Sequence, residues 1–480
     1  MDALGPSASA LELAGALRRQ ELSAVELLDS CLEAVDQLNP ELNAIIWRND
    51  EQARRAAQDA DRCLRALAGD GAGEHEHMPF LGVPIPIKDL TPVAGWPTTY
   101  GSHGAGTSPS DESELVVDAF VRAGFVLCAR TNTPEFGVLT VTENSRYGVT
   151  HNPWDLSRSP GGSSGGAAAA VAAGMFALAH ANDGGGSIRI PASYCGLVGL
   201  KPSRGRVPRL AQSWLGAVVE GALTRTVADS AAVLDAISEP DPLAWYNAPA
   251  PERAFADETE RQPDPLRIGL MAAAPLGIPT APVCTAAAQA AGAMLEQLGH
   301  VVEPVEVPTV SEEMIPPFVL LTQAGLGEYD DVDFSAVEPH VAYQHKLSGE
   351  VGAREYVQAG RTLELMSRRE LARWGRDFDV LLTPTSGIEP PPAGSILAAQ
   401  HGAPDQPVAD VISSVSFTAF SNITGQPAIS LPLHFTETGL PIGVMLTGGP
   451  WQEATLIRLA ARLEEAYPWC ERRPSLAGAA

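Results

Sequence analysis

The alternation of helix-like and strand-like segments is the feature that most constrains the fold of this chain. Residues 113–132, SELVVDAFVRAGFVLCARTN, have the pattern of a helix, a turn and a strand. Residues 266–307 have the pattern of a strand, a helix and a second strand. Such alternation is typical of proteins in which helices cover a sheet with parallel strands. We therefore predict an α/β fold.

We expect the chain to form one domain over residues 1–480, which can be divided into four regions by their sequence patterns. The regions are N-terminal helices (1–68), a core that would carry the chemistry (about 78–235), an inserted lobe with loops (about 236–375), and C-terminal strands with a final helix (376–470). The first region has serine caps before helix-spaced apolar residues, and the last has a hairpin pattern. Residues 238–265 are rich in proline and acidic residues, which indicates a surface connection or a lid.

Composition narrows the partners and the cellular location that we expect for this protein. The chain has 480 residues, of which 45% are hydrophobic, so it can bury a large core. Its net charge of -26 would repel nucleic acids and anionic membranes, so we expect neither as a partner. We expect no secretion signal and no membrane span, because the sequence shows no basic leader before an apolar run and no apolar run of sufficient length. With six scattered cysteines that suggest reduced thiols, these features predict a cytoplasmic protein.

A glycine- and serine-rich stretch at residues 159–208 is the strongest candidate for chemistry. It contains SPGGSSGG, then a run of small residues typical of a closely packed helix, then HANDGGGSIRIPAS. Glycine leaves backbone N–H groups uncovered, so the DGGGS segment that ends at Ser187 would place amide donors beside a hydroxyl. A nucleophile beside donors for a developing oxyanion is what acyl transfer requires.

Other interpretations of this stretch are a flexible linker, a phosphate-binding loop and a serine hydrolase that uses histidine. Glycine-rich stretches are usually turns or linkers. Neither glycine motif that binds phosphate is present, and the G-x-S-x-G motif of α/β-hydrolases is absent around Ser187. His151 and His180 lie near the stretch in sequence, and we expect both to be structural or solvent-facing. The linker interpretation stays open at this point.

Lys88 is the second candidate, at the end of the apolar, proline-spaced run FLGVPIPIKDL. The chain has only three lysines, Lys88, Lys201 and Lys346, against 29 arginines. An arginine cannot lose its proton in a protein, whereas a desolvated lysine can. A lysine where a strand enters the core is therefore a candidate base.

Residues 159–208 resemble the signature of the amidase signature family, in which GGSSGG and a small-residue helix precede D-x-G-G-S-[IV]-R-x-P-A. Other segments resemble further family motifs: GVPIPIKDL at 82–90, TNTPEF at 131–136, DVLLTPT at 379–385 and NITGQPAISLP at 422–432. The resemblance thus extends over most of the chain. It implies an α/β/α sandwich around a large twisted mixed β-sheet, and a serine hydrolase with a Ser–cis-Ser–Lys triad.

The resemblance also implies a catalytic set of Lys88, Ser163 and Ser187. Ser187 would be the nucleophile, and Ser163 would relay a proton between Ser187 and Lys88. Lys88 would be the base, because burial lowers the pKa of a lysine from its free value near ~10.4. In the family the bridging serine follows a cis peptide bond, so we expect Gly162–Ser163 to be cis.

Residues around this set receive supporting roles by the same resemblance. We expect Ser164 to hydrogen-bond near Lys88, and Asp183 and Arg189 to brace the loop. The backbone amides expected to form the oxyanion hole are those of Gly184, Gly185, Gly186 and Ser187. Many family members have Thr or Ile at the position of Gly184, so we expect a looser turn here. No metal and no cofactor are expected.

The substrate pocket and substrate class follow from the resemblance as well. The residues expected to line the pocket are Phe136, Thr322, Ile423 and Gln426. HANDGGGSIRIPAS resembles the branch that includes hydrolases of nylon-type cyclic and linear oligoamides and enzymes acting on carbamates. We therefore expect a free-standing hydrolase that cleaves C–N bonds of small, largely apolar aryl or alkyl amides, a class that extends to oligoamides and carbamates (urethanes), with esterase side activity.

Two alternative functions stay open. One is the glutaminase-type subunit of a tRNA-dependent amidotransferase complex. Those subunits resemble S-I-R-Q-P at this point, whereas this chain has Ile190 in place of the glutamine. The other is a catalytically silent binding protein, against which the complete set of Lys88, Ser163 and Ser187 argues. The expected partner is a small-molecule amide or carbamate, and a homodimer is compatible with the sequence.

Overall fold

The computed structural model describes residues 5–67, 78–306 and 313–476. The strands are β1 (Ile45–Arg48), β2 (Pro84–Lys88), β3 (Val126–Thr131), β4 (Glu143–Asn144), β5 (Gly148–Val149), β6 (Leu178–Asp183), β7 (Val198–Lys201), β8 (Val219–Thr224), β9 (Arg267–Leu270), β10 (Val301–Pro304), β11 (Val380–Pro384), β12 (Ala428–Phe435) and β13 (Pro441–Thr447). The α-helices are α1 (Ala10–Arg18), α2 (Ala24–Leu42), α3 (Asp50–Leu67), α4 (Leu115–Arg122), α5 (Gly165–Ala172), α6 (Arg189–Cys195), α7 (Val227–Ile237), α8 (Phe255–Glu258), α9 (Pro282–Gln297), α10 (Ile315–Ala324), α11 (Pro339–Ser348), α12 (Ala353–Leu371), α13 (Ser395–Gly402), α14 (Ala409–Val415), α15 (Ala419–Thr424) and α16 (Glu453–Ala466). Short 3-10 helices are η1 (Glu135–Gly137), η2 (Trp214–Gly216), η3 (Pro275–Gly277) and η4 (Gly325–Glu328).

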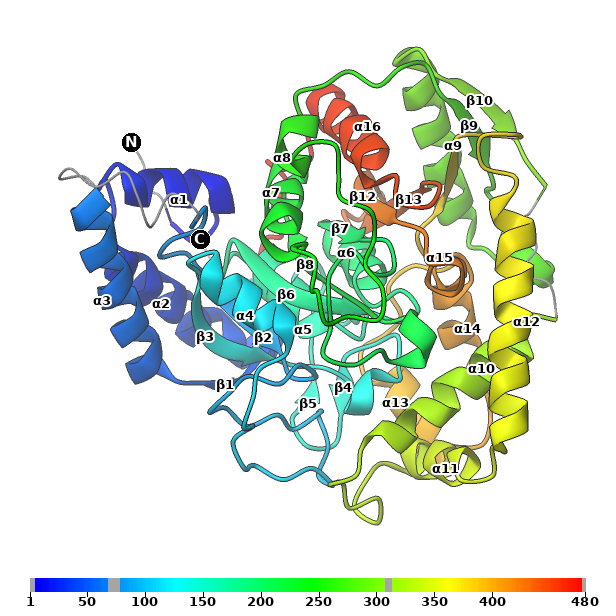
Figure 1. The fold of residues 1–480 in the computed structure, drawn as a ribbon, viewed down its shortest axis with the longest axis horizontal. Helices are drawn as coiled ribbons and strands as arrows, with labels where there is room; N and C mark the ends of the chain where they lie inside the picture. The colour runs from blue at the N-terminus through cyan, green and yellow to red at the C-terminus, as the bar shows by residue number, and fades with distance from the viewer. Residues whose placement is uncertain (1–4, 68–77, 307–312, 477–480) are drawn as a thin grey trace.

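An eight-stranded sheet forms the centre of the protein, in the order β10-β9-β11-β13-β12-β7-β8-β6. β9 pairs in parallel with β10 and β11, and the remaining neighbours pair antiparallel, so the sheet is mixed. A three-stranded sheet, β1-β3-β2, lies next to it, because β2 runs beside the edge strand β6. Helices α5 and α6 pack as one group, and α7, α8 and α16 as another, around this sheet (Figure 1). The predicted α/β class and layered mixed sheet are confirmed.

Several local predictions also agree with the structure. The N-terminal region folds into α1, α2 and α3, and Ser9 and Ser23 cap the first two helices. β9, α9 and β10 form the predicted strand–helix–strand unit. β12 and β13 form the predicted antiparallel hairpin. Thus the periodicity of apolar residues identified these elements correctly.

The region between residues 236 and 375 contributes to two parts of the fold. β9 and β10 form one edge of the eight-stranded sheet. Helix α10 packs against α11 and α12, and this group contacts α13 through α11 and α15 through α12 (Figure 1). This second group supplies one wall of the pocket described below.

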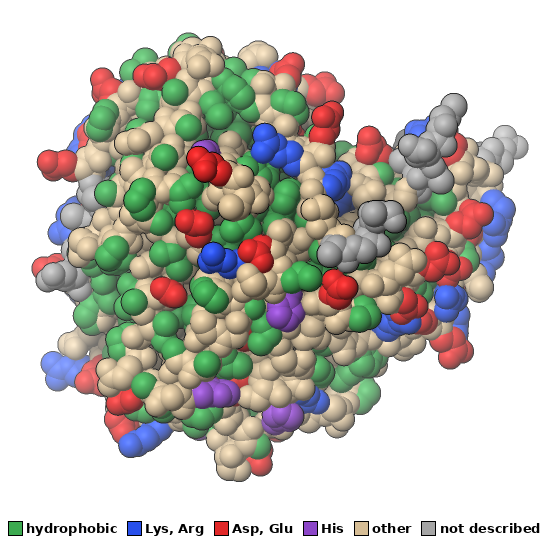
Figure 2. Space-filling model, turned by 180° about the vertical axis from the view of Figure 1, so that it is seen from behind, with side chains coloured by type: hydrophobic (Ala, Val, Ile, Leu, Met, Phe, Trp, Pro, Cys, Tyr) green, Lys and Arg blue, Asp and Glu red, His purple; other side chains and the backbone are tan. Residues whose placement is uncertain are grey.

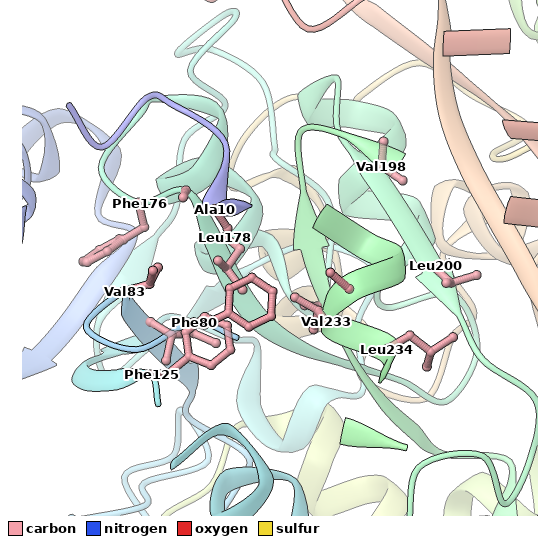
Figure 3. Close-up of a cluster of buried hydrophobic side chains, with 14 of the residues drawn as sticks. Ala10, Phe80, Val83, Phe125, Phe176, Leu178, Val198, Leu200, Val233 and Leu234 are labelled. Atoms are coloured by element: carbon pink, nitrogen blue, oxygen red, sulfur yellow. The ribbon is translucent and has the colours of Figure 1, made fainter. Parts of the chain in front are cut away.

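A continuous apolar core holds the strand that carries Lys88. Phe80 and Phe125 stack with ring centroids 4.5 Å apart, and Val83 and Leu178 lie beside them (Figure 3). Val83 directly precedes β2, and Leu178 opens β6. Burial of apolar surface contributes about 25 cal/mol per Å², so this cluster fixes β2 and β6 side by side.

The GGSSGG segment is buried and closely packed, which rules out the linker interpretation. All eight residues of α5 are buried. A Cβ atom on Gly162 would lie 2.4 Å from the carbonyl oxygen of Val141, and one on Gly166 would lie 2.5 Å from the backbone nitrogen of Asn132. Glycine is therefore required here for close approach of backbones, rather than for flexibility.

One face of the molecule carries charged side chains of both signs (Figure 2). On the face shown in Figure 2, acidic and basic side chains are interspersed among apolar and polar ones, and the described basic residues do not gather there into one patch. None of the helices in the described ranges combines the length and the apolar character that crossing a membrane would demand.

Candidate active site

Lys88 is the last residue of β2, and its side chain is fully buried. Its Nζ lies 2.7 Å from Ser163 Oγ, 2.8 Å from Ser164 Oγ and 2.7 Å from Asn182 Oδ1. Because β2 runs beside β6, the end of β2 meets Asn182 near the end of β6. The predicted contacts of Lys88 with both serines are confirmed, whereas the contact with Asn182 was not predicted.

Burial lowers the pKa of Lys88 to about 7, although the negative charges of Glu220 and Asp183 act in the opposite direction. A buried ammonium loses its hydration, so the neutral amine is favoured. At a pH a little above neutral, most Lys88 side chains therefore carry a free lone pair.

A chain of polar contacts supports Lys88 from behind. The backbone N–H of Lys88 donates to His180 Nδ1 at 3.2 Å, and His180 Nε2 lies 2.9 Å from Glu220 Oε2. The other oxygen of Glu220 is 2.7 Å from Arg209 Nη1. His180 is fully buried, and burial lowers its pKa, so the ring is neutral and acts as an acceptor and a donor. The expectation that His180 is structural holds, since its ring positions backbone and contacts neither serine.

Ser163 follows a cis peptide bond, Gly162–Ser163, as predicted. Ser163 is almost fully buried, while Ser187 is partly exposed, and both line the same pocket. Ser163 thus lies between the buried amine of Lys88 and the pocket that Ser187 faces.

The loop before Ser187 is organised by Asp183. The Asp183 carboxylate accepts the N–H groups of Gly186 at 2.7 Å and Ile188 at 3.1 Å. The structure therefore differs from the prediction at Gly186, because its N–H is already donated to Asp183. Within the described residues, the N–H groups of Gly184, Gly185 and Ser187 have no protein acceptor. These three remain available as oxyanion donors.

Arg189 braces this loop in the predicted way. Its guanidinium makes two hydrogen bonds of 2.9 Å with the Asp183 carboxylate, and all of these groups are fully buried. Burial alone would raise the pKa of Asp183, but the charge of Arg189 outweighs it and holds the pKa well below its ordinary value. Arg189 also donates to Asn422 Oδ1 at 2.6 Å, and so ties the loop to α15. The Asp183 carboxylate is therefore held as an anion.

Gly184, where a looser turn was expected, packs under Trp214. A Cβ atom on Gly184 would lie 2.8 Å from the ring of Trp214 and 3.1 Å from Val218. The space that a Thr or Ile side chain would fill is occupied by the indole. The turn is therefore packed from outside by a residue of η2.

Two pockets of about 630 Å³ and about 750 Å³ meet at Ser187, and both are lined by Trp214 and Thr322. The first is lined by Phe136 and Tyr329 together with Arg209 and Glu328. The further apolar residues that line the second are Val138, Leu139, Ile190, Phe318, Val319, Val411 and Val415.

The structure places the predicted pocket residues in different positions. Phe136 and Thr322 line the pockets at Ser187. Ile423 instead lines a neighbouring cavity. Gln426 is fully buried, donates to the Gly448 carbonyl at 2.6 Å and accepts from Thr424 Oγ1. Ile423 and Gln426 therefore do not fit the predicted role.

The sequence analysis missed Asn182, Trp214 and Arg209. Asn182 stands one residue before the DGGGS segment, and an amide two residues from a glycine turn was a usable signal. Trp214 and Arg209 lie in an irregular segment between β7 and β8, where no periodicity places side chains. Their positions depend on the fold of the whole chain.

Comparison with known proteins agrees with this site. The sequence model of the Amidase family matches residues 26–457. The chain is 37% identical to the putative amidase AmiB2 of Mycobacterium tuberculosis over 467 residues, which cover 95% of each chain. It is 36% identical to the 6-aminohexanoate-cyclic-dimer hydrolase of Paenarthrobacter ureafaciens over 488 residues, which cover 96% of this chain and 95% of the relative.

Solved structures give the same result in three dimensions. The structure of a 6-aminohexanoate cyclic dimer hydrolase complexed with substrate superposes with a TM-score of 0.90 and 32% identity, over 98% of this chain and all of the other. The chain shares both fold and sequence with these proteins along nearly its whole length. It also has two serines in one pocket and a buried lysine in contact with one of them. The chain therefore belongs to the amidase family, whose members are amidase-type hydrolases of C–N bonds.

Proposed function

We propose that this protein hydrolyses small, largely apolar amides through an acyl-enzyme on Ser187, with Lys88 as base and Ser163 as relay. The observation that carries the proposal is the position of Lys88 Nζ, which is buried and 2.7 Å from the hydroxyl of Ser163. A serine hydroxyl is a poor nucleophile until an adjacent group removes its proton.

The neighbours of Lys88 accommodate a neutral amine that accepts a proton from Ser163. Asn182 Oδ1 can only accept, and Ser164 Oγ donates to the Asn182 carbonyl at 3.3 Å, which leaves it free to accept from Lys88. A neutral amine has two N–H groups for these two acceptors. Its lone pair then faces the Ser163 hydroxyl.

Acylation follows from this arrangement. Lys88 takes the proton of Ser163, Ser163 takes the proton of Ser187, and Ser187 Oγ forms a bond to the carbonyl carbon of the amide. The oxyanion receives hydrogen bonds from the free N–H groups of Gly184, Gly185 and Ser187, and loss of one such donor typically costs about 3–4 kcal/mol of barrier. The C–N bond then breaks as Ser163 gives a proton to the leaving amine and regains one from Lys88.

Deacylation uses the same groups in reverse. A water molecule gives its proton through Ser163 to Lys88 and attacks the ester of the acylated Ser187. The tetrahedral intermediate collapses, Ser187 regains a proton and the acid leaves. Carbamates and esters react by the same steps, because each places an acyl group on the serine.

The pockets support the substrate class. Apolar side chains, aliphatic ones together with Trp214 and Phe318, predominate in the second pocket, about 750 Å³, whose polar side chains are those of Thr140, Ser187, Thr322, Gln323 and Gln344. The first pocket is mixed, since it combines the aromatic rings of Phe136, Trp214 and Tyr329 with the charged side chains of Arg209 and Glu328. The relative from Paenarthrobacter ureafaciens is named for the hydrolysis of a cyclic dimer of 6-aminohexanoate. We include cyclic and linear oligoamides in the proposed class on this basis.

A cytoplasmic location is also proposed, supported by six unpaired cysteines.

A fluorophosphonate probe tests the proposal. Wild-type protein should form one covalent adduct, which peptide mass spectrometry places on Ser187, and Ser187→Ala should form none and lose turnover. Hydrolysis is then measured on a panel of anilides, alkyl amides, cyclic oligoamides, aryl carbamates and glutamine. Activity on glutamine alone would favour the amidotransferase subunit, and absence of both adduct and turnover would favour a silent binding protein.

A further inference from the structure

A cluster of one glutamate and two histidines lies where α11 meets α13. Glu338 is the residue before α11, His340 is in the first turn of that helix, and His401 is in the last turn of α13. One oxygen of Glu338, Oε2, is 3.6 Å from His340 Nδ1 and 3.7 Å from His401 Nε2. We propose that Glu338, His340 and His401 bind one divalent transition-metal ion, with Zn²⁺ as the ion that these side chains favour.

The first support for the site is buried polar atoms without partners. His340 is fully buried, and neither of its ring nitrogens has a hydrogen-bond partner among the described residues. Glu338 is 5% exposed, and its Oε2 is also unpartnered within that part of the chain. The distances to the histidines exceed those of a hydrogen bond. Because buried polar groups are almost always paired, these atoms point to a missing ligand.

The second support is the chemistry and spacing of the donors. Two imidazoles and one carboxylate are a common zinc ligand set that leaves a position for water. A neutral imidazole offers a metal ion a lone pair on a ring nitrogen. The ligand atoms of all three residues lie within 4.8 Å of one another. Bonds of about 2.0–2.2 Å to one ion require ligand atoms about 3–4 Å apart, so a small rotation of the half-exposed His401 completes the site.

The third support is an excess of buried carboxylates around the cluster. The backbone N–H of Glu338 donates to Glu135 at 2.8 Å, and Glu143 caps α13 through Gly394 and Leu397. Glu135, Glu143 and Glu338 are all buried. A divalent cation at Glu338 would offset the repulsion among these carboxylates.

The site would act on the pocket through a helix and would take no part in the chemistry. None of the three ligands lines either pocket at Ser187 in the described residues. Helix α11, however, also carries Gln344, which lines the second pocket. An ion that joins α11 to α13 therefore fixes one pocket wall. It should raise stability and leave the reaction at Ser187 in place.

Zn²⁺ titration of untagged, EDTA-treated protein tests the proposal. We expect one equivalent to bind by calorimetry and to remain after dialysis by elemental analysis, with a rise in Tm. Co²⁺ in the same position should give the visible absorption bands of a protein-bound ion of low coordination number. The metal-free protein should still hydrolyse its amide substrate at low temperature.

Variants distinguish this site from binding by surface histidines. His401→Ala removes a partly exposed side chain and should weaken Zn²⁺ binding at least about tenfold. Glu338→Gln keeps an acceptor for Ser145 and should weaken binding as well. His103→Ala removes an exposed histidine outside the cluster and should bind like wild type. Absence of stoichiometric binding, or equal binding by wild type and a correctly folded His401→Ala, would overturn the proposal.

Discussion

Lys88 differs in kind from the arginines that fill most basic positions of this chain, because a lysine can release its proton when water is removed from it. Its surroundings supply two acceptors and one hydroxyl, which match the two N–H groups and the lone pair of a neutral amine. A permanently charged guanidinium could not serve as a base in this position.

Lys88 should make folding stability depend on pH. Its pKa is about 7 in the folded protein and near 10.5 when solvated. Between these two pH values the unfolded chain binds one more proton than the folded protein, so the free energy of unfolding rises with pH from about 7 to about 10.5. Below about pH 7 the full destabilisation caused by burying Lys88 is present. At about 1.4 kcal/mol per pH unit, the cost at neutral pH is several kcal/mol.

Urea unfolding of wild type and Lys88→Met at about pH 7 and about pH 10 measures this effect. The stability of wild type relative to the variant should rise with pH. Lys201, which is also buried with a pKa of about 7, is present in both proteins and cancels. A difference between the two proteins that does not change with pH would contradict the assigned protonation.

Asn182 should set the working pH range of the enzyme. In Asn182→Asp, a carboxylate replaces the amide oxygen that lies 2.7 Å from Lys88 Nζ. The added charge should raise the pKa of Lys88 and move the rising limb of the kcat/KM profile to higher pH. Activity should recover at the alkaline end, which a merely misfolded variant would not do. An unshifted profile with lower activity at every pH would show that Asn182 does not act on Lys88.

At the scale of elements, α5 depends on glycines at its backbone contacts. A Cβ atom on Gly166 would lie 2.5–2.7 Å from backbone atoms of Asn132 and Ala44. Gly166→Ala should therefore destabilise the protein by at least about 1–3 kcal/mol, measured by chemical unfolding. Gly327→Ala in η4 is the matched control, since a Cβ there meets nothing within 4 Å. Equal stability of the two variants would contradict the packing described for α5.

The contact between η2 and the serine loop should be measurable as a coupling. Gly184→Thr would drive a side chain into the indole of Trp214, displace the N–H groups proposed as oxyanion donors and lower kcat. In a Trp214→Ala background the same change should cost less, because the space is then free. A double-mutant cycle in kcat/KM quantifies the coupling. Strictly additive effects would mean that Trp214 does not shape the loop.

At the scale of the whole molecule, the net charge of -26 should affect substrates according to their charge. The kcat/KM of a cationic amide should fall as NaCl rises from about 20 mM to about 500 mM, because salt screens long-range attraction. A neutral amide of the same size should show no such dependence. The two substrates are compared at one pH, and equal responses to salt would assign the effect to something other than charge.

The limits of prediction from sequence also appear at this scale. Periodicity identified α1 to α3, the β9–α9–β10 unit and the β12–β13 hairpin, because each depends on neighbours within one segment. The resemblance to the signature predicted that Lys88, Ser163 and Ser187 come together, and in the structure Lys88 Nζ contacts Ser163 Oγ while both serines line one pocket. Local pattern could not place Trp214 over Gly184 or bring His401 to Glu338, since those contacts join residues 30 or more positions apart.

The pocket shows the same limit most clearly. Ile423 and Gln426 belong to a segment that resembles a family motif, yet one faces a neighbouring cavity and the other satisfies its amide inside the core. Gly186 was assigned a free N–H, but Asp183, three residues away, takes it. A motif fixes which residues are near the site, whereas the direction of each polar group depends on its hydrogen-bond partners.

The pH dependence of kcat/KM for a neutral amide, measured from about pH 5 to about pH 10, tests the role of Lys88 most directly. The structure predicts a rise with a midpoint near 7 and then a plateau, together with loss of nearly all activity in Lys88→Ala. A rate that is flat across this range, or one that still climbs toward pH 10 as expected for a solvated lysine, would contradict the proposed base.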